Sequence, residues 1–176
     1  MKAAAPRKSN IVHMKNLLLV FATIFITQSV LSQSQSLPAV TLKDLDGKDV
    51  NTATLSNDGK PMLICFWATW CSPCKKELNT YADYYEEWQK ETGVKIYAVT
   101  IDDQRTVNSV KPYVNSVSWE YEILSDVNKT FSQAMGVNSP PHTFLLNGKG
   151  ELVWQHVGYT PGDEEEVHEQ LLKLAH

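Results

Sequence analysis

From residue 38 onward, the hydrophobic positions of the chain alternate between the periods of strands and helices. One continuous apolar stretch, 62–67, has the length and composition of a strand buried on both faces, as in parallel sheets, and residues 94–101 form the next predicted strand. Between them, four apolar side chains recur at helical spacing, namely Leu78, Tyr81, Tyr85 and Trp88. The pattern predicts a strand, a long helix ending near Gly93, and a second strand.

The remaining segments are shorter but follow the same alternation. Asp46-Gly47 is a strong hairpin turn between two short strands. Further predicted elements are a helix over 106–116 interrupted near Pro112, a strand over 121–124, a helix over 128–135, a hairpin over 143–154, and a final helix with acidic residues in its first turn. The chain therefore reads as one α/β domain over residues 38–176.

The first 32 residues have a different character. Lys15 precedes an apolar run over 17–26, which is shorter than the ~20 residues that span a bilayer, and small residues follow up to Ser32. This order is typical of a cleaved export signal, with an uncleaved anchor as the alternative. Either Met1 or Met14 fits as the start. We expect an N-terminal extension and signal over 1–32, a polar linker over 33–37, and export, most simply to a periplasm.

The net charge of the predicted domain differs from that of the whole chain. The whole chain has 176 residues and a net charge of −4. Residues 1–32 hold four of the 16 Lys and Arg and no acid, so residues 33–176 carry 12 basic and 20 acidic residues, a net of −8. An acidic domain without a basic block argues against nucleic acid as a partner. Only three cysteines are present, which excludes a small scaffold held by many disulfides.

Two of the cysteines stand where the first buried strand meets the long helix. Cys71 and Cys74 are separated by Ser72-Pro73, which brings their sulfurs within disulfide reach at a helix N-terminus. The helix dipole and free N–H groups stabilise a thiolate on Cys71, the form that attacks disulfides. Cys74, one turn further along, is placed to resolve the mixed disulfide.

Other uses of the pair fit less well. A zinc site needs about four ligands, and no second cysteine pair exists. Covalent haem needs a histidine after the second cysteine, where Lys75 stands. A purely structural disulfide stays open, although a bridge that closes so short a loop adds little stability. Redox activity is the favoured interpretation, with no cofactor.

At this point a resemblance is clear. Residues 66–77 (Phe-Trp-Ala-Thr-Trp-Cys-Ser-Pro-Cys-Lys-Lys-Glu) and 137–146 (Val-Asn-Ser-Pro-Pro-His-Thr-Phe-Leu-Leu) resemble the active-site and cis-proline segments of the TlpA-like thiol–disulfide oxidoreductases, a branch of the thioredoxin family. The likeness covers roughly residues 37–176. It implies a thioredoxin fold, with a central mixed β-sheet flanked by helices and an added N-terminal β-hairpin. It also implies dithiol–disulfide exchange with a client protein.

The resemblance assigns roles to further residues. Glu77, three positions after Cys74 and so on the same helical face, would accept the proton of the resolving thiol. Asn79 stands where the family often has a proline, which puts the usual helix kink in doubt. Cys65 occupies the strand position of a buried aspartate in cytoplasmic thioredoxins and is most simply a core residue; a back-up resolving thiol is the alternative.

The second segment predicts the surface that meets the client. Pro141 would be the cis-proline beside the disulfide, and the residue before it would offer backbone groups to the client. That residue is Pro140, which has no N–H, so we expect one hydrogen bond to be missing and apolar contact from Trp70 and Pro73 to matter more. His142 would tune Cys71 or lie at the rim of the client groove.

These observations favour a monomeric, exported reductase of protein disulfides, supplied with electrons by a membrane-embedded donor and acting in cytochrome c maturation or general envelope thiol chemistry. The absence of a histidine between the cysteines favours reduction over oxidation. Two alternatives stay open. One is a peroxiredoxin-like thiol peroxidase, and the other is a metal-carrying module that uses Cys71, Cys74 and His142.

Overall fold

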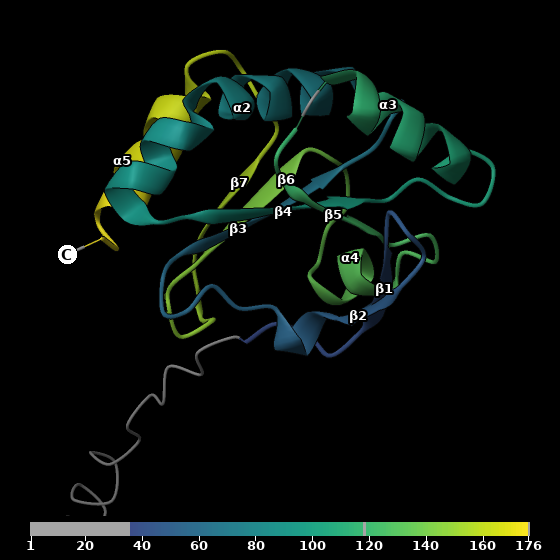
Figure 1. Ribbon diagram of the computed structural model, residues 1–176, viewed down its shortest axis with the longest axis horizontal. Helices are drawn as coiled ribbons and strands as arrows, with labels where there is room; N and C mark the ends of the chain where they lie inside the picture. The colour runs from purple at the N-terminus through teal and green to yellow at the C-terminus, as the bar shows by residue number, and fades with distance from the viewer. Residues whose placement is uncertain (1–35, 118, 176) are drawn as a thin grey trace, which may run out of the picture. The chain divides into compact units, whose positions relative to one another are not determined.

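The computed structural model describes residues 36–117 and 119–175, so the expected signal over 1–32 lies outside the described residues. The described part contains one sheet in the strand order β2-β1-β5-β4-β3-β6-β7 (Figure 1). The strands are β1 (Thr41–Asp44), β2 (Asp49–Asn51), β3 (Met62–Trp67), β4 (Lys95–Thr100), β5 (Glu122–Ser125), β6 (His142–Leu146) and β7 (Leu152–Val157). The helices are α2 (Ser72–Thr92), α3 (Val110–Val117), α4 (Thr130–Ala134) and α5 (Asp163–Leu172), with short 3₁₀ helices η1 (Thr52–Thr54) and η2 (Val107–Ser109).

Strand β3 is the centre of the sheet. All six of its side chains are buried, and it pairs parallel with β4 and antiparallel with β6. Parallel neighbours need a crossover, and α2 provides it. Gly93 ends α2 with φ of 68°, a left-handed conformation that favours glycine. The predicted strand–helix–strand unit is therefore confirmed.

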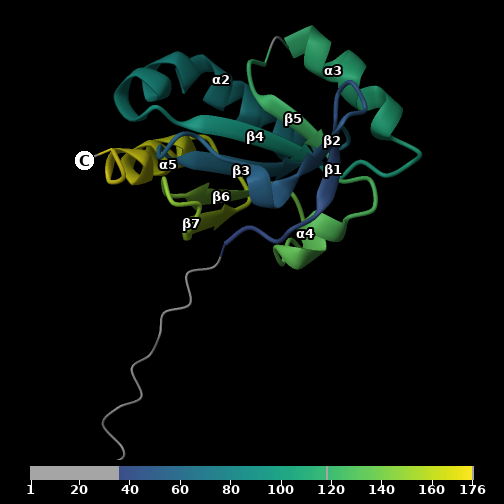
Figure 2. The same ribbon diagram turned by 60° about the horizontal axis from the view of Figure 1, so that its bottom comes forward.

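Helices cover both faces of the sheet. Helices α2 and α3 lie on one face and α4 on the other (Figures 1 and 2). Successive side chains of β3 point to opposite faces: the Trp67 ring lies 5.7 Å from Tyr113 of α3, and the Phe66 ring lies 5.4 Å from Phe131 of α4. None of the helices in the described residues has the length and apolar composition that a membrane span needs.

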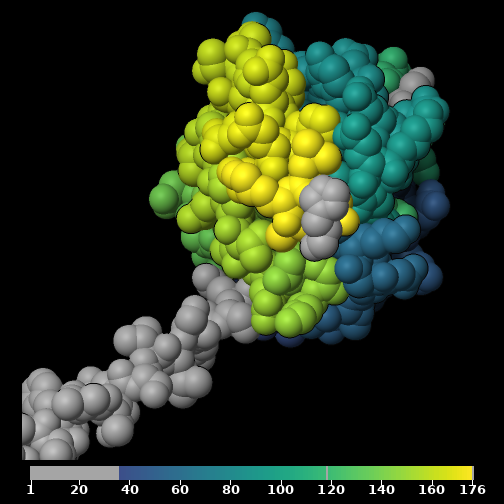
Figure 3. All heavy atoms as spheres, turned by 90° about the vertical axis from the view of Figure 1, so that its left-hand side faces the viewer, coloured from purple at the N-terminus to yellow at the C-terminus, as the bar shows by residue number. Residues whose placement is uncertain are grey.

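Helix α5 packs beside α2 (Figure 3). His168 of α5 stacks on Trp88 of α2, and its Nε2 lies 2.5 Å from Oε2 of Glu91. The contact joins residues far apart in the chain, which sequence spacing does not reveal.

The helix expected over 106–116 differs in one respect. Its irregularity lies before Pro112, where η2 ends at Ser109 and α3 begins at Val110. Pro112 occupies the first turn of α3, where backbone N–H groups have no partner within a helix, so the missing N–H of proline costs little.

The predicted N-terminal hairpin is confirmed. Strands β1 and β2 pair antiparallel around a turn at Gly47, and an ion pair of 2.6 Å joins Lys43 to Asp49 across them. Strand β1 also pairs with β5, so the hairpin extends the main sheet. The architecture is the predicted mixed α/β sheet flanked by helices.

Candidate active site

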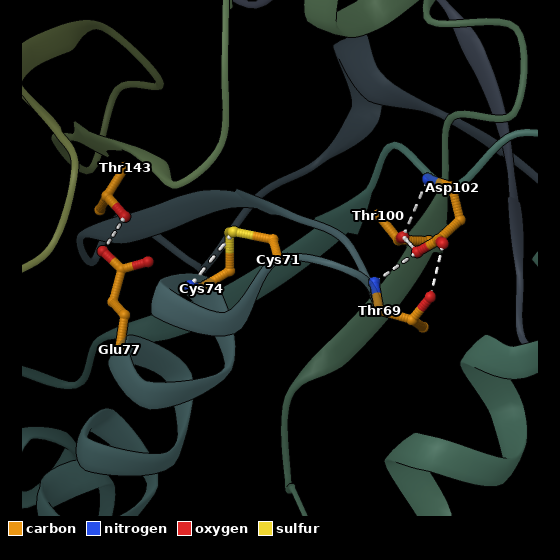
Figure 4. The surroundings of a disulfide bond; sticks show 7 residues. All are labelled: Thr69, Cys71, Cys74, Glu77, Thr100, Asp102 and Thr143. Carbon is orange, nitrogen blue, oxygen red and sulfur yellow. Dashed lines mark hydrogen bonds between the residues drawn. A yellow bond between two sulfur atoms is a disulfide. The ribbon is translucent and has the colours of Figure 1, made fainter. Parts of the chain in front are cut away.

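Cys71 and Cys74 form a disulfide at the N-terminus of α2 (Figure 4). Cys71 is the N-cap residue, and the backbone N–H of Cys74 donates to Cys71 Sγ at 3.3 Å. Cys71 is 5% exposed and Cys74 is fully buried. Cys71 is thus the cysteine open to attack from outside, and it stands where free helical N–H groups stabilise a thiolate.

Two apolar residues next to the pair, Trp70 and Pro73, are exposed. The Trp70 side chain is 56% exposed, and Pro73 is exposed in the first turn of α2. An exposed Trp beside a reactive sulfur is the kind of residue that dominates protein contacts. The structure thus presents two of the predicted client-binding residues, Trp70 and Pro73, to solvent beside Cys71.

Glu77 lies one helical turn behind Cys74 and is only 1% exposed. Its Oε1 accepts hydrogen bonds from Tyr81 Oη and Thr143 Oγ1, each at 3.0 Å. Its Oε2 is buried without a hydrogen-bond partner among the described residues. Burial raises the pKa of Glu77 to about 7, against the opposing effect of those two hydrogen bonds. A carboxyl with this pKa exchanges protons readily near neutral pH.

Cys65 is a free, fully buried thiol on β3. It pairs in register with Thr143 of β6, the residue that donates to Glu77. Burial, with the nearby Glu77 carboxylate, raises the pKa of the Cys65 thiol well above its ordinary value. Cys65 is therefore held as an unreactive thiol, as expected of a core residue.

The peptide bond between Pro140 and Pro141 is cis, as the sequence predicted. The carbonyl of Pro141 accepts a hydrogen bond from Gly158 N–H at 2.9 Å, which ties the segment to the end of β7. Pro141 is buried and Pro140 is half-buried. Since Pro140 lacks an N–H, its only backbone hydrogen-bonding group is its carbonyl.

His142 is buried, which differs from one of its two predicted places, the rim of the client groove; its influence on Cys71 stays a prediction. Its ring stacks on Phe144 at 4.1 Å, its Nε2 lies 3.1 Å from Gln155 Oε1, and it is only 6% exposed. Neighbouring side chains alternate along a strand, and Thr143 points toward Glu77, so His142 points to the opposite face of the sheet. Its side chain belongs to the core there, which argues against its predicted place in the client groove.

Two partners of Glu77 were not singled out for chemistry from the sequence. Tyr81 was predicted only as a core residue, although its position four residues after Glu77 places it on the same helical face. Thr143 follows the cis-proline by two residues, and only the pairing of β6 with β3 shows that it faces α2. In the described ranges, no three His, Cys, Asp or Glu side chains are grouped so as to hold a metal ion.

Comparison with known proteins agrees with this geometry. Residues 34–155 match the model of the AhpC/TSA family. The thiol–disulfide oxidoreductase ResA of Bacillus subtilis (strain 168) is 30% identical over 134 residues, which cover 76% of this chain and 72% of that protein. ResA of Bacillus anthracis is 30% identical over 152 residues, covering 86% and 82%.

Solved structures support the same assignment. An uncharacterized thioredoxin-like protein from Porphyromonas gingivalis is 45% identical, with a TM-score of 0.72 over 79% of this chain and 91% of that chain. StoA from Bacillus subtilis shares the fold, with a TM-score of 0.59 and 24% identity over 77% of this chain and 99% of that chain. The chain therefore belongs to the AhpC/TSA family and is a ResA-like, TlpA-like thiol–disulfide oxidoreductase with the thioredoxin fold.

Proposed function

We propose that this oxidoreductase reduces disulfides of client proteins outside the cytoplasm, with Cys71 as nucleophile and Cys74 as resolving thiol. The observation that carries the proposal is the placement of Cys71 at the N-terminus of α2, with Cys74 buried behind it and the carboxyl of Glu77 one turn further in. This order matches the order in which the two sulfurs must react.

The reaction begins with the reduced pair. The Cys71 thiolate attacks one sulfur of the client disulfide, a Cys71–client disulfide forms, and the other client sulfur leaves as a thiolate. The Cys74 thiol then gives its proton to Glu77 and attacks the Cys71 sulfur. The second client sulfur leaves, so the client gains two electrons and Cys71–Cys74 is oxidised. A membrane-embedded donor returns two electrons to the pair.

The proposed setting rests on residues 1–32, whose basic, apolar and small-residue order is that of an export signal. The client class follows the family resemblance, namely cysteines reduced in cytochrome c maturation or in general envelope thiol chemistry. The domain acts as a monomer. Reduction rather than oxidation is favoured by Ser72-Pro73, which places no histidine between the cysteines.

The pairing of Cys71 with Cys74 supports this function over a thiol peroxidase. A peroxidatic cysteine reacts alone with peroxide before it meets a partner, whereas here the partner stands three residues away in the same helix turn. The metal-carrying alternative loses its third ligand, because His142 points to the other face of the sheet. A peroxide-consumption assay separates the two enzyme activities.

Replacing Cys74 with serine is expected to trap the client on Cys71, because the remaining sulfur attacks but nothing resolves the mixed disulfide. The measurement is non-reducing electrophoresis of the purified complex, followed by mass spectrometry of the client. The matched control is Cys71→Ser/Cys74→Ser, which should trap nothing. If the control traps a client, the assignment of Cys71 as the nucleophile is wrong. The same holds if Cys65→Ala, added to Cys74→Ser, abolishes trapping.

Replacing Pro140 with threonine is expected to speed mixed-disulfide formation with protein clients. The new N–H supplies one hydrogen bond to the client backbone, which at about 1 kcal/mol corresponds to a rate change of roughly fivefold. Stopped-flow mixing of reduced protein with an oxidised client peptide measures the rate. Pro140→Ala, which restores the N–H with a smaller side chain, should behave alike; unchanged rates in both variants would refute the idea.

A further inference from the structure

A second buried carboxylate lies beside the active-site loop. Asp102 follows β4 by two residues and is completely buried. Burying a carboxylate is costly unless its oxygens are hydrogen-bonded or paired with a cation. None of the ion pairs among residues 36–117 and 119–175 includes Asp102. Its stability therefore depends on hydrogen bonds.

Those hydrogen bonds come mainly from the loop that carries Cys71. The backbone N–H of Thr69 donates to Asp102 Oδ2 at 2.8 Å, and Thr69 Oγ1 donates to Oδ1 at 2.6 Å. Thr100 Oγ1 at the end of β4 donates to Oδ2 at 2.6 Å. Asp102 thus holds Thr69, the residue two positions before Cys71, by two hydrogen bonds. Asp102 and Glu77 lie on opposite sides of the disulfide (Figure 4).

Thr69 is part of the turn that connects β3 to Cys71 at the start of α2. The N–H of Cys71 donates to the carbonyl of Ala68 at 3.0 Å and closes a turn with Thr69 at its first central position. The ends of β3 and β4 are joined by the N–H of Ile101, which donates to the carbonyl of Trp67 at 2.8 Å. The turn is therefore anchored to the ends of β3 and β4 at the centre of the sheet.

We infer that Asp102 is a positioning residue, whose carboxylate holds the Thr69 turn so that Cys71 Sγ stays at the N-terminus of α2. The inference rests on the proposed role of Cys71 as the nucleophile. In the disulfide, the N–H of Cys74 donates to Cys71 Sγ at 3.3 Å. After reduction, the helical N–H groups at this place would stabilise the Cys71 thiolate. Such stabilisation and the reaction rate both depend on placement to within about 1 Å.

The Asp102 carboxylate could act on Cys71 by positioning it or by its negative charge, and the two predict opposite changes in the pKa of Cys71 when the carboxylate is removed. If the carboxylate acts through the turn, removing it displaces the sulfur and raises the pKa of Cys71. If it acted only as a nearby negative charge, removing it would relieve repulsion and lower that pKa. Asp102→Asn separates the two, since its amide oxygen can accept from Thr69 N–H and Thr100 Oγ1 while its N–H donates to Thr69 Oγ1.

The experiment compares Asp102→Ala, Asp102→Asn and Thr69→Val in the full chain, with Asp103→Ala as the control that removes a neighbouring carboxylate paired instead with Arg105. Alkylation of Cys71 by iodoacetamide across pH gives its pKa, and insulin reduction gives the rate. We expect Asp102→Ala to raise that pKa by about one unit and to slow reduction at least ~10-fold. Thr69→Val should slow it roughly threefold, whereas Asp102→Asn and Asp103→Ala should stay within about 1.5-fold of the parent.

A folded Asp102→Ala variant with an unchanged pKa and rate would overturn the inference, as would a pKa lowered alike in the Ala and Asn variants. If Asp102→Ala fails to give a cooperative thermal transition, Thr69→Val decides: unchanged kinetics there would also overturn it. If the parent protein does not reduce insulin, the proposed function fails, while the alkylation profiles still report on Asp102.

Discussion

Replacing Cys71 with serine is expected to abolish the reduction of protein disulfides. A serine hydroxyl at the N-terminus of α2 stays protonated at neutral pH, whereas the cysteine it replaces is stabilised as a thiolate by the same helix end. Loss of a covalent nucleophile typically lowers turnover on the order of 10³-fold or more. Insulin reduction by the pre-reduced protein, followed by turbidity, measures the effect.

The matched control for this variant is Cys65→Ala. It also removes one cysteine of the chain, but a thiol that is fully buried on β3. We expect it to keep its reductase activity and to lose about 1–2 kcal/mol of stability through the small cavity it leaves. If Cys71→Ser keeps its activity, or if Cys65→Ala loses activity while it stays folded, the assignment of Cys71 as the nucleophile is wrong.

Replacing Glu77 with glutamine is expected to slow the resolving step about 10²-fold at pH 7, because the Cys74 thiol loses its proton acceptor. In the parent protein, release of reduced client should accelerate as pH rises through about 7, where burial places the pKa of Glu77. Single-turnover release of client thiols across pH measures both effects. The control is Glu86→Gln, an exposed carboxylate on the same helix.

The same variant has a second readout in stability. The pKa of Glu77 is raised from 4.5 to about 7 in the folded state, so the folded protein binds more protons than the unfolded chain between those values. Stability therefore falls as pH rises through this window, by about 3 kcal/mol in full. Relative to the parent, Glu77→Gln should gain about 2–3 kcal/mol between pH 5 and pH 8 in urea unfolding. Parallel pH profiles would show that Glu77 titrates normally.

Local features of the sequence predicted the centre of the molecule well. The apolar run at β3 and the helical spacing of α2 each identify one element without knowledge of the rest, and Cys71 and Cys74 are close because they are close in the chain. Glu77 was predicted from helical geometry together with the family resemblance. In each case the residues that carry the prediction lie within one strand or one helix.

Features that depend on strand pairing could not be predicted in this way. Thr143 reaches Glu77 from 66 positions away in the chain, and Thr69 reaches Asp102 from 33 positions away. The face to which His142 points depends on the register of β6 against β3, and a shift of one residue would reverse it. The sequence alone does not determine how the strands pair, so these contacts could be found only in the structure.

The N-terminal hairpin has a consequence for aggregation. Without it, the outer edge of the sheet on that side would be β5, whose Ile123 and Leu124 side chains are buried. With it, the edge is β2, a strand of three residues whose two ends, Asp49 and Asn51, are exposed. Short, polar edges resist pairing with foreign strands. This end of the sheet therefore exposes little backbone with which a strand of another protein could pair.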